Sequence, residues 1–176
     1  MKKLVLLPLL IAFMLHGCGS GGSKDEEQPD LSYIQYQYFE CNQSGFCSLN
    51  STVHTDSAAT GTTLYATIAD IGTPDAVLTI HFKSTEISVD FEGVGNYSSD
   101  HTNLSVEHCT YDGLLNPCYR IMPNKPPSGA YMEIHSWTSD YIEGNIRYLI
   151  VSLDALNNRY KYAGIDRAEF KIKVRK

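Results

Sequence analysis

The segment Glu86-Ile87-Ser88-Val89-Asp90-Phe91-Glu92 alternates strictly between polar and apolar residues. Successive side chains of a strand point to opposite sides, so Ile87, Val89 and Phe91 would share one buried face. Residues 167–175, Arg-Ala-Glu-Phe-Lys-Ile-Lys-Val-Arg, repeat this pattern. Their basic residues would therefore form the wet face of a strand and not a nucleic-acid patch. Both segments predict half-buried β-strands.

The rest of the chain after residue 30 predicts the same class of structure. Residues 64–68, 77–82, 131–135 and 144–153 are rich in β-branched and aromatic residues. Glycine, proline and asparagine turn signals separate them, and Asn157-Asn158 reads as a hairpin connection. No segment predicts a convincing helix. We therefore expect residues 31–176 to form one all-β domain, an antiparallel β-sandwich or a barrel-like fold.

Residues 1–17 have the layout of a cleaved export signal. Lys2 and Lys3 precede an apolar run that is too short to span a bilayer. The following Leu15-His16-Gly17-Cys18 resembles the lipobox of bacterial lipoproteins, which implies that Cys18 is lipidated and becomes the mature N-terminus. Residues 18–30 are expected to be a flexible tether, because they lack residues able to join a core.

The predicted location is the bacterial cell envelope. In the lipoprotein resemblance, glycine and not aspartate after Cys18 implies the outer membrane, with the side of that membrane left open. The protein would then bind the membrane through acyl chains on Cys18. A net charge of −6 argues against nucleic acid and anionic membrane surfaces as further partners.

Four further cysteines, Cys41, Cys47, Cys109 and Cys118, are an even number in a chain addressed to an oxidising compartment, which favours two disulfides. Three pairings are possible. We prefer the two local ones, 41 with 47 and 109 with 118, because each pair brackets a short loop that can turn back on itself. The alternative, a zinc site, is disfavoured by the spacings, so we predict no metal and no cofactor.

The second half of the chain runs from an apolar segment at 77–82, through the turn Gly93-Val94-Gly95-Asn96-Tyr97 and the segment 131–135, to the segments 142–146 and 165–172. In this order residues 77–176 resemble small β-rich bacterial lipoproteins of unassigned function. The chain departs from that pattern at Ile146, where phenylalanine is commoner, and at Ala168, where glycine is commoner. The resemblance implies a β-sandwich-like fold and an envelope location, with no activity attached.

The sequence lacks the familiar catalytic motifs, and we therefore predict that the protein is not an enzyme. The sequence has no Gly-x-Ser-x-Gly elbow, no His-Glu-x-x-His and no phosphate-binding glycine loop. Glu107-His108-Cys109 is the densest cluster of reactive residue types. A nucleophile or metal role there requires a free Cys109, whereas the disulfide hypothesis uses that thiol.

Aromatic residues are the clearest candidates for ligand contact. Tyr36, Tyr38, Trp137 and Tyr141 are possible ligand-facing aromatics, because rings on a rigid sheet stack on sugars or anchor a protein partner. The alternative is that the tyrosine rings are buried in the core, with wet hydroxyls. Separately, Asp56-Ser57-Ala58 resembles the O-glycosylation site of Bacteroidota. The simpler interpretation is a flexible loop within residues 48–63.

These expectations combine into two hypotheses about function. The first is a lipoprotein anchored in the outer membrane, whose non-enzymatic β-rich domain serves binding or structure, with an unknown protein or glycan partner. The alternative is a periplasmic inhibitor or immunity lipoprotein that blocks a toxin or a cell-wall hydrolase. In that case an acidic loop at residues 86–90 or 100–107 would meet a basic active site.

Overall fold

The computed structural model describes residues 29–42, 44, 46–100, 103–110, 118–121, 129–154 and 159–175, without the side chains of 152–154 and 159–160. The signal expected at 1–17, Cys18 and most of the tether expected at 18–30 lie outside these residues. In the described part no helix has the length and apolar character needed to cross a membrane.

Eleven strands and one short 3-10 helix, Ala58–Thr60, make up the regular structure of the described residues. The strands are β1 Tyr33–Cys41, β2 Cys47–Ser57, β3 Leu64–Ala69, β4 Val77–Phe82, β5 Thr85–Asp90, β6 Gly95–Ser98, β7 Ser105–Cys109, β8 Cys118–Arg120, β9 Gly129–Trp137, β10 Tyr141–Asp154 and β11 Arg159–Arg175. The all-β class is confirmed.

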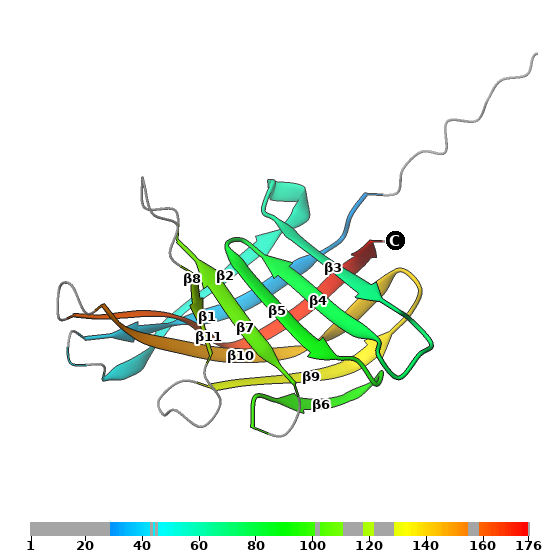
Figure 1. Cartoon of the computed structure of the whole chain (residues 1–176). Coiled ribbons are helices and arrows are strands. Elements are labelled where there is room, and N and C mark those ends of the chain that lie inside the picture. Colours follow the sequence, from blue (N-terminus) through cyan, green and yellow to red (C-terminus); the bar gives the residue numbers. More distant parts are fainter. Residues whose placement is uncertain are drawn as a thin grey trace, which may run out of the picture.

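One curled sheet folds back on itself to give two facing layers (Figure 1). Strand β11 joins them, because one of its edges pairs first with β1 and then, near its C-terminal end, with β3. Strands β6, β9, β10, β11, β1 and β2 form one layer, and β3, β4, β5, β7 and β8 form the other. The β11–β3 pair is parallel. The sheet is therefore a curled half-barrel, which agrees with the expected barrel-like fold, and β11–β3 is the parallel exception among its otherwise antiparallel pairs in the described residues.

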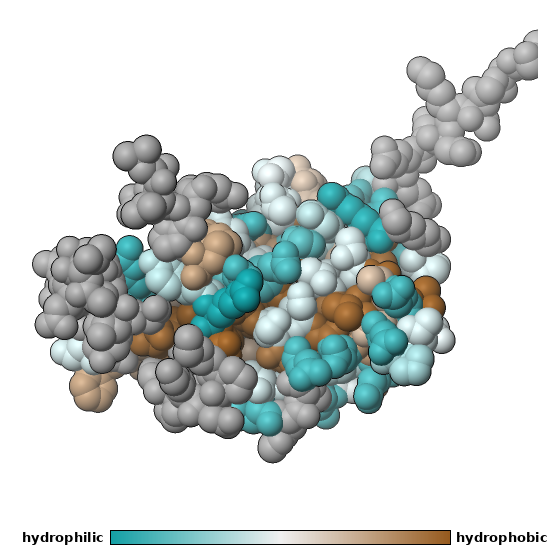
Figure 2. All heavy atoms as spheres, in the orientation of Figure 1, coloured by the Kyte–Doolittle hydropathy of each residue, from teal (hydrophilic) through white to brown (hydrophobic). Residues whose placement is uncertain are grey.

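The core lies between the two layers, where the alternating segments place their apolar residues. Ile87 and Val89 are each 1% exposed, whereas Glu86 and Asp90 on the other face of β5 are exposed. Phe170 and Ile172 of β11 enter the same core from the opposite layer. Brown residues show between teal side chains in the middle of Figure 2, where the layers face each other.

A β-bulge in β11 keeps apolar residues inward along its length. Three steps of β11, from Ile165 to Ala168, oppose two steps of β10, and Arg167 takes a φ of 50°. The extra residue shifts the alternation by one position. Ile165 and Ala168 therefore both face the core although an odd number of positions separates them.

One expected loop is a strand. Most of residues 48–63 belong to β2 and to the 3-10 helix after it, and β2 pairs with β1 from Tyr33↔Ser57 to Cys41↔Cys47. The hairpin expected around residues 157–158 fits the register, because Asp154 of β10 pairs with Arg159 of β11. The connecting residues themselves lie outside the described part.

Candidate functional site

A polar cluster joins the first hairpin to the β4–β5 turn. Lys83, in a two-residue turn with a φ of 53°, places its Nζ 2.7 Å from Asp56 Oδ2 of β2 and 2.9 Å from the Tyr36 hydroxyl of β1. The Tyr36 hydroxyl donates to Asp56 at 2.6 Å, and it lies 2.8 Å from the Tyr38 hydroxyl. His54 stacks on the Tyr36 ring.

Mutual hydrogen bonding sets the protonation states of this cluster. Burial acts to raise the pKa of the Asp56 carboxyl, but hydrogen bonds from Lys83 and Tyr36 outweigh it and hold that pKa below its ordinary value. Burial acts to lower the pKa of Lys83, but the hydrogen bond to Asp56 raises it overall. Burial and the bond to Asp56 raise the pKa of Tyr36. Lys83 therefore stays an ammonium, Asp56 a carboxylate and Tyr36 a neutral phenol.

The polar cluster acts as a structural tie between the layers. The Lys83 ammonium has three donors, and it has partners in Asp56, Tyr36 and, at 3.3 Å, Tyr38. For Asp56, Lys83 and Tyr36, each pKa shift favours the charge state already present, so these three groups are not poised to exchange a proton. We therefore assign this cluster to stability.

Asp56→Asn is expected to destabilise the domain by about 1–2 kcal/mol at pH 7, because it removes a half-buried charge pair. Since the folded-state pKa of Asp56 is lowered, its contribution is present above the unfolded value near 3.8 and is lost as pH falls through the folded value. Urea unfolding of wild type and variant from pH 7 to pH 3 should show the difference shrinking below about pH 4.

The matched control is Glu143→Gln, which breaks a similarly short pair with Lys171 whose carboxylate is more exposed, at 41% against 21% for Asp56. It should change stability much less, because exposed ion pairs are screened by water. A difference between wild type and Asp56→Asn that is the same at pH 3 and pH 7 would contradict the assignment.

A second buried polar chain links the layers through Thr85. The Thr85 hydroxyl lies 2.9 Å from His108 Nδ1 and 3.2 Å from the Tyr148 hydroxyl. Burial lowers the pKa of His108, and burial raises the pKa of Tyr148 to about 12. Both side chains are therefore neutral near pH 7, which suits a packed interior.

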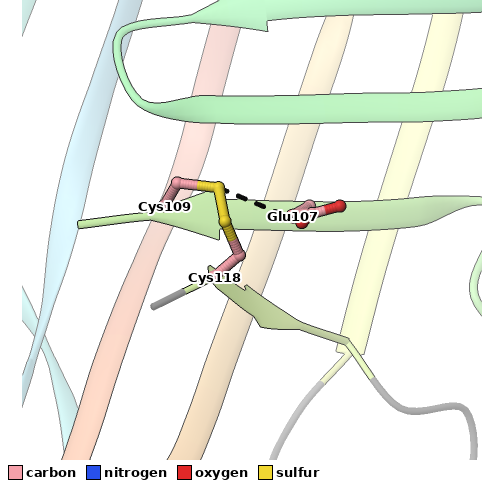
Figure 3. A group of neighbouring side chains, drawn as sticks. All are labelled: Glu107, Cys109 and Cys118. Carbon is pink, nitrogen blue, oxygen red and sulfur yellow. Dashed lines mark hydrogen bonds between the residues drawn. A yellow bond between two sulfur atoms is a disulfide. The ribbon is translucent and has the colours of Figure 1, made fainter. Parts of the chain in front are cut away.

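Both predicted local disulfides are confirmed: Cys41 with Cys47 and Cys109 with Cys118. Figure 3 shows the second bond joining β7 to β8, with Glu107 beside it. Glu107, Cys109 and Cys118 bring three candidate ligand atoms, two sulfurs and a carboxylate oxygen, within 4.8 Å of one another. Both sulfurs are consumed by the disulfide, however, and Glu107 pairs with Arg120 at 2.8 Å. This group therefore offers neither a thiolate ligand nor a nucleophile.

The aromatic candidates separate by environment. Tyr36 is 1% exposed, so its prediction as a ligand-facing residue is wrong: its ring is in the core and its hydroxyl in the polar cluster. Tyr38 is 36% exposed but shares that cluster. Trp137, the last residue of β9, is 37% exposed, and its ring meets that of Phe91 edge-on.

Tyr141 is half-buried on the outer face of β10. The Lys171 ammonium lies 5.1 Å from the centre of the Tyr141 ring, and the Tyr141 hydroxyl accepts the Leu31 N–H at 3.4 Å.

Ser57 and Ala58 are half-buried where β2 ends, and Asp56 belongs to the polar cluster. The sequence Asp56-Ser57-Ala58 is therefore not in a flexible loop. Cys18 lies outside the described residues.

A concave pocket lies at the edge strand β6. Its volume is about 390 Å³, and its lining side chains include two carboxylates, two carboxamides and an exposed valine, namely Asp90, Glu92, Asn96, Asn103 and Val94. Tyr97 fixes the loop before β6, because its hydroxyl donates to the Gly93 carbonyl at 2.6 Å and accepts the Glu92 N–H at 3.2 Å. The pocket is the strongest candidate binding site of the described residues.

Sequence reasoning did not find this pocket, although it singled out part of it. The turn at residues 93–97 supplies the loop and Asn96, and its tyrosine is the residue that holds the loop in place. The two carboxylates come from the wet face at the end of β5, and Asn103 comes from the approach to β7. No local motif connects these three segments.

Comparison with protein-family models, curated proteins and solved structures finds no match to this chain.

Proposed function

We propose that this chain is a lipoprotein of the bacterial outer membrane, anchored through acyl chains on Cys18, with a non-enzymatic binding or structural domain at residues 31–176. The carrying observation is that all four cysteines of this domain are closed into two disulfides. Such bonds persist in oxidising compartments, which agrees with an exported chain. Of the five cysteines in the sequence, Cys18 alone remains for lipidation.

The bonding of Glu107, His108 and Cys109, the densest cluster of reactive residue types in the sequence, supports a role without catalysis. Cys109 is in a disulfide, Glu107 is paired with Arg120, and His108 Nδ1 contacts Thr85 inside the fold. A nucleophile needs a free thiolate with a base beside it. These three side chains each have a structural partner instead.

Cys18→Ser is expected to move the protein from the membrane fraction to the soluble fraction, because each buried acyl methylene contributes about 0.8 kcal/mol to anchoring. Membrane fractionation and metabolic labelling with palmitate measure this directly. The control is the double variant Cys41→Ser/Cys47→Ser, which removes a disulfide and should keep both label and membrane attachment. Membrane attachment retained by Cys18→Ser would overturn the lipoprotein assignment.

The inhibitor or immunity role is the second candidate, and exposed carboxylates favour it. Glu86 and Asp90 are exposed on the outer face of β5, and Glu92 is exposed two residues beyond its end. Residues 86–90 belong to strand β5, as their alternation predicted, so the acidic loop that this role invoked there is wrong. In the other expected acidic loop, residues 101–102 lie outside the described part and residues 105–107 belong to β7. This role requires a basic protein partner.

A further inference from the structure

We propose that the pocket beside β6 binds an uncharged saccharide, with the Tyr131 ring as a stacking platform next to it. The inference rests on the proposed function, because it names the ligand class of that binding domain. The residues that would bond the sugar hydroxyls are the polar lining groups Asp90, Glu92, Asn96 and Asn103.

The pocket has the size and rigidity of a small-molecule site. A volume of about 390 Å³ falls within the range of about 300–1,000 Å³ typical of ligand pockets. Its floor is held by the hydrogen bonds of Tyr97, whose side chain is only 4% exposed. A pocket built in advance loses little entropy when a ligand enters.

The lining chemistry matches a polyol. Carboxylates accept hydrogen bonds, and carboxamides both accept and donate them, so the pocket can pair with hydroxyls that do both. None of the lining residues that the structure describes is lysine, arginine or histidine. A phosphate, sulfate or uronate would therefore find no cationic partner among these residues. An uncharged sugar needs no such partner.

A cation is a poorer occupant than a sugar. Within the described part of the chain the pocket supplies two carboxylates and no histidine or cysteine, and Asp90 Oδ2 already accepts a hydrogen bond from the Asn103 amide. Asp90 and Glu92 are both exposed. Ion pairs at exposed positions are screened and add little affinity. Charge alone therefore does not make this a site for an ammonium or guanidinium group.

Tyr131 supplies apolar contact area beside the pocket. Its side chain is 42% exposed on β9, and its hydroxyl donates at 2.7 Å to Oδ1 of Asn96, one of the residues that line the pocket. Aromatic rings bring large contact area at low entropic cost. On β9 the Glu133 carboxylate lies 3.2 Å from His135 Nε2, and on β10 Arg147 pairs with Asp166 of β11.

Biolayer interferometry on the full-length protein, purified in detergent, tests the proposal. The immobilised probes are five uncharged polysaccharides: starch, dextran, barley β-glucan, yeast mannan and galactan. Polygalacturonate and poly-lysine serve as anionic and cationic probes. We expect binding to at least one uncharged probe that persists at high salt. Tyr131→Ala should weaken it about tenfold or more. Tyr131→Phe, which keeps the ring, should weaken it only a few-fold.

The matched control is Tyr33→Ala, which removes another exposed tyrosine of the same layer, far from the pocket. It should leave binding unchanged. The proposal is overturned if no uncharged probe binds, if Tyr33→Ala and Tyr131→Ala act alike, or if binding is limited to a charged probe. Salt-sensitive binding to poly-lysine alone would favour the inhibitor role. Membrane release by Cys18→Ser without saccharide binding would overturn this inference and leave the proposed anchoring standing.

Discussion

Replacing Ile87 with aspartate should abolish the folded state of the domain. Ile87 is 1% exposed at the centre of β5, between Ile80 of β4 and Val106 of β7. A carboxylate there would have no partner, and burying an unpaired charge costs several kcal/mol. That cost is comparable with the whole stability of an ordinary domain, about 5–15 kcal/mol. Circular dichroism during urea titration should show no cooperative transition.

Ser88→Asp is the matched control, since it adds the same carboxylate one residue further along the chain. Ser88 is half-buried on the outer face, and its hydroxyl lies 3.2 Å from that of Thr79. An aspartate there stays in contact with water, so we expect a loss of about 1 kcal/mol or less. If the two variants lose the same stability, the assigned facing of β5 is wrong.

Strands whose buried faces are apolar were predictable from the sequence. The expected strand at residues 77–82 coincides with β4, and the alternation around Ile87 and Phe170 places both in the core. In such strands one face is dry, so the hydrophobic period records the side on which each residue lies. The local disulfides were also predictable, because each joins cysteines that are close in sequence, six and nine residues apart, and that pair across neighbouring strands.

Strand β2 was missed because its inward positions are polar. His54 and Asp56 face Tyr36 and Lys83 in the polar cluster, so no apolar period marks the strand. What holds β2 in place is a hydrogen-bonded cluster assembled from three separate segments. Composition therefore indicated a loop where tertiary contacts make a strand.

The curl of the sheet and the position of the pocket also lie beyond local sequence signals. The parallel contact of β11 with β3 brings Val174 beside Ala66, and nothing in either segment specifies the other. Likewise, Tyr131 meets Asn96 only because β6 pairs with β9 across a long separation in sequence. In the strand expected at residues 131–135, Tyr131 shares a face with Glu133 and His135. This polar face was the sequence signal for the exposure of Tyr131.

Gly144→Ala is expected to destabilise the domain by about 3 kcal/mol, because no space exists for the added methyl group. A Cβ at Gly144 would lie 2.0 Å from the Glu133 carbonyl oxygen and 3.0 Å from Phe170 Cζ. The carbonyl comes this close because β9 bulges opposite the step from Glu143 to Gly144. To admit the methyl group, β9 and β10 must move apart in the middle of the sheet, which breaks backbone hydrogen bonds.

Gly129→Ala tests whether the effect comes from the close approach or from losing any strand glycine. Gly129 starts β9, and a Cβ added there would have no atom within 4 Å beyond its chain neighbours. Its replacement should leave stability within about 1 kcal/mol of wild type, or raise it slightly by restricting the unfolded chain. Urea unfolding compares both variants. Equal losses would show that β9 and β10 are not forced together at Glu133, because then only the backbone freedom of glycine would matter.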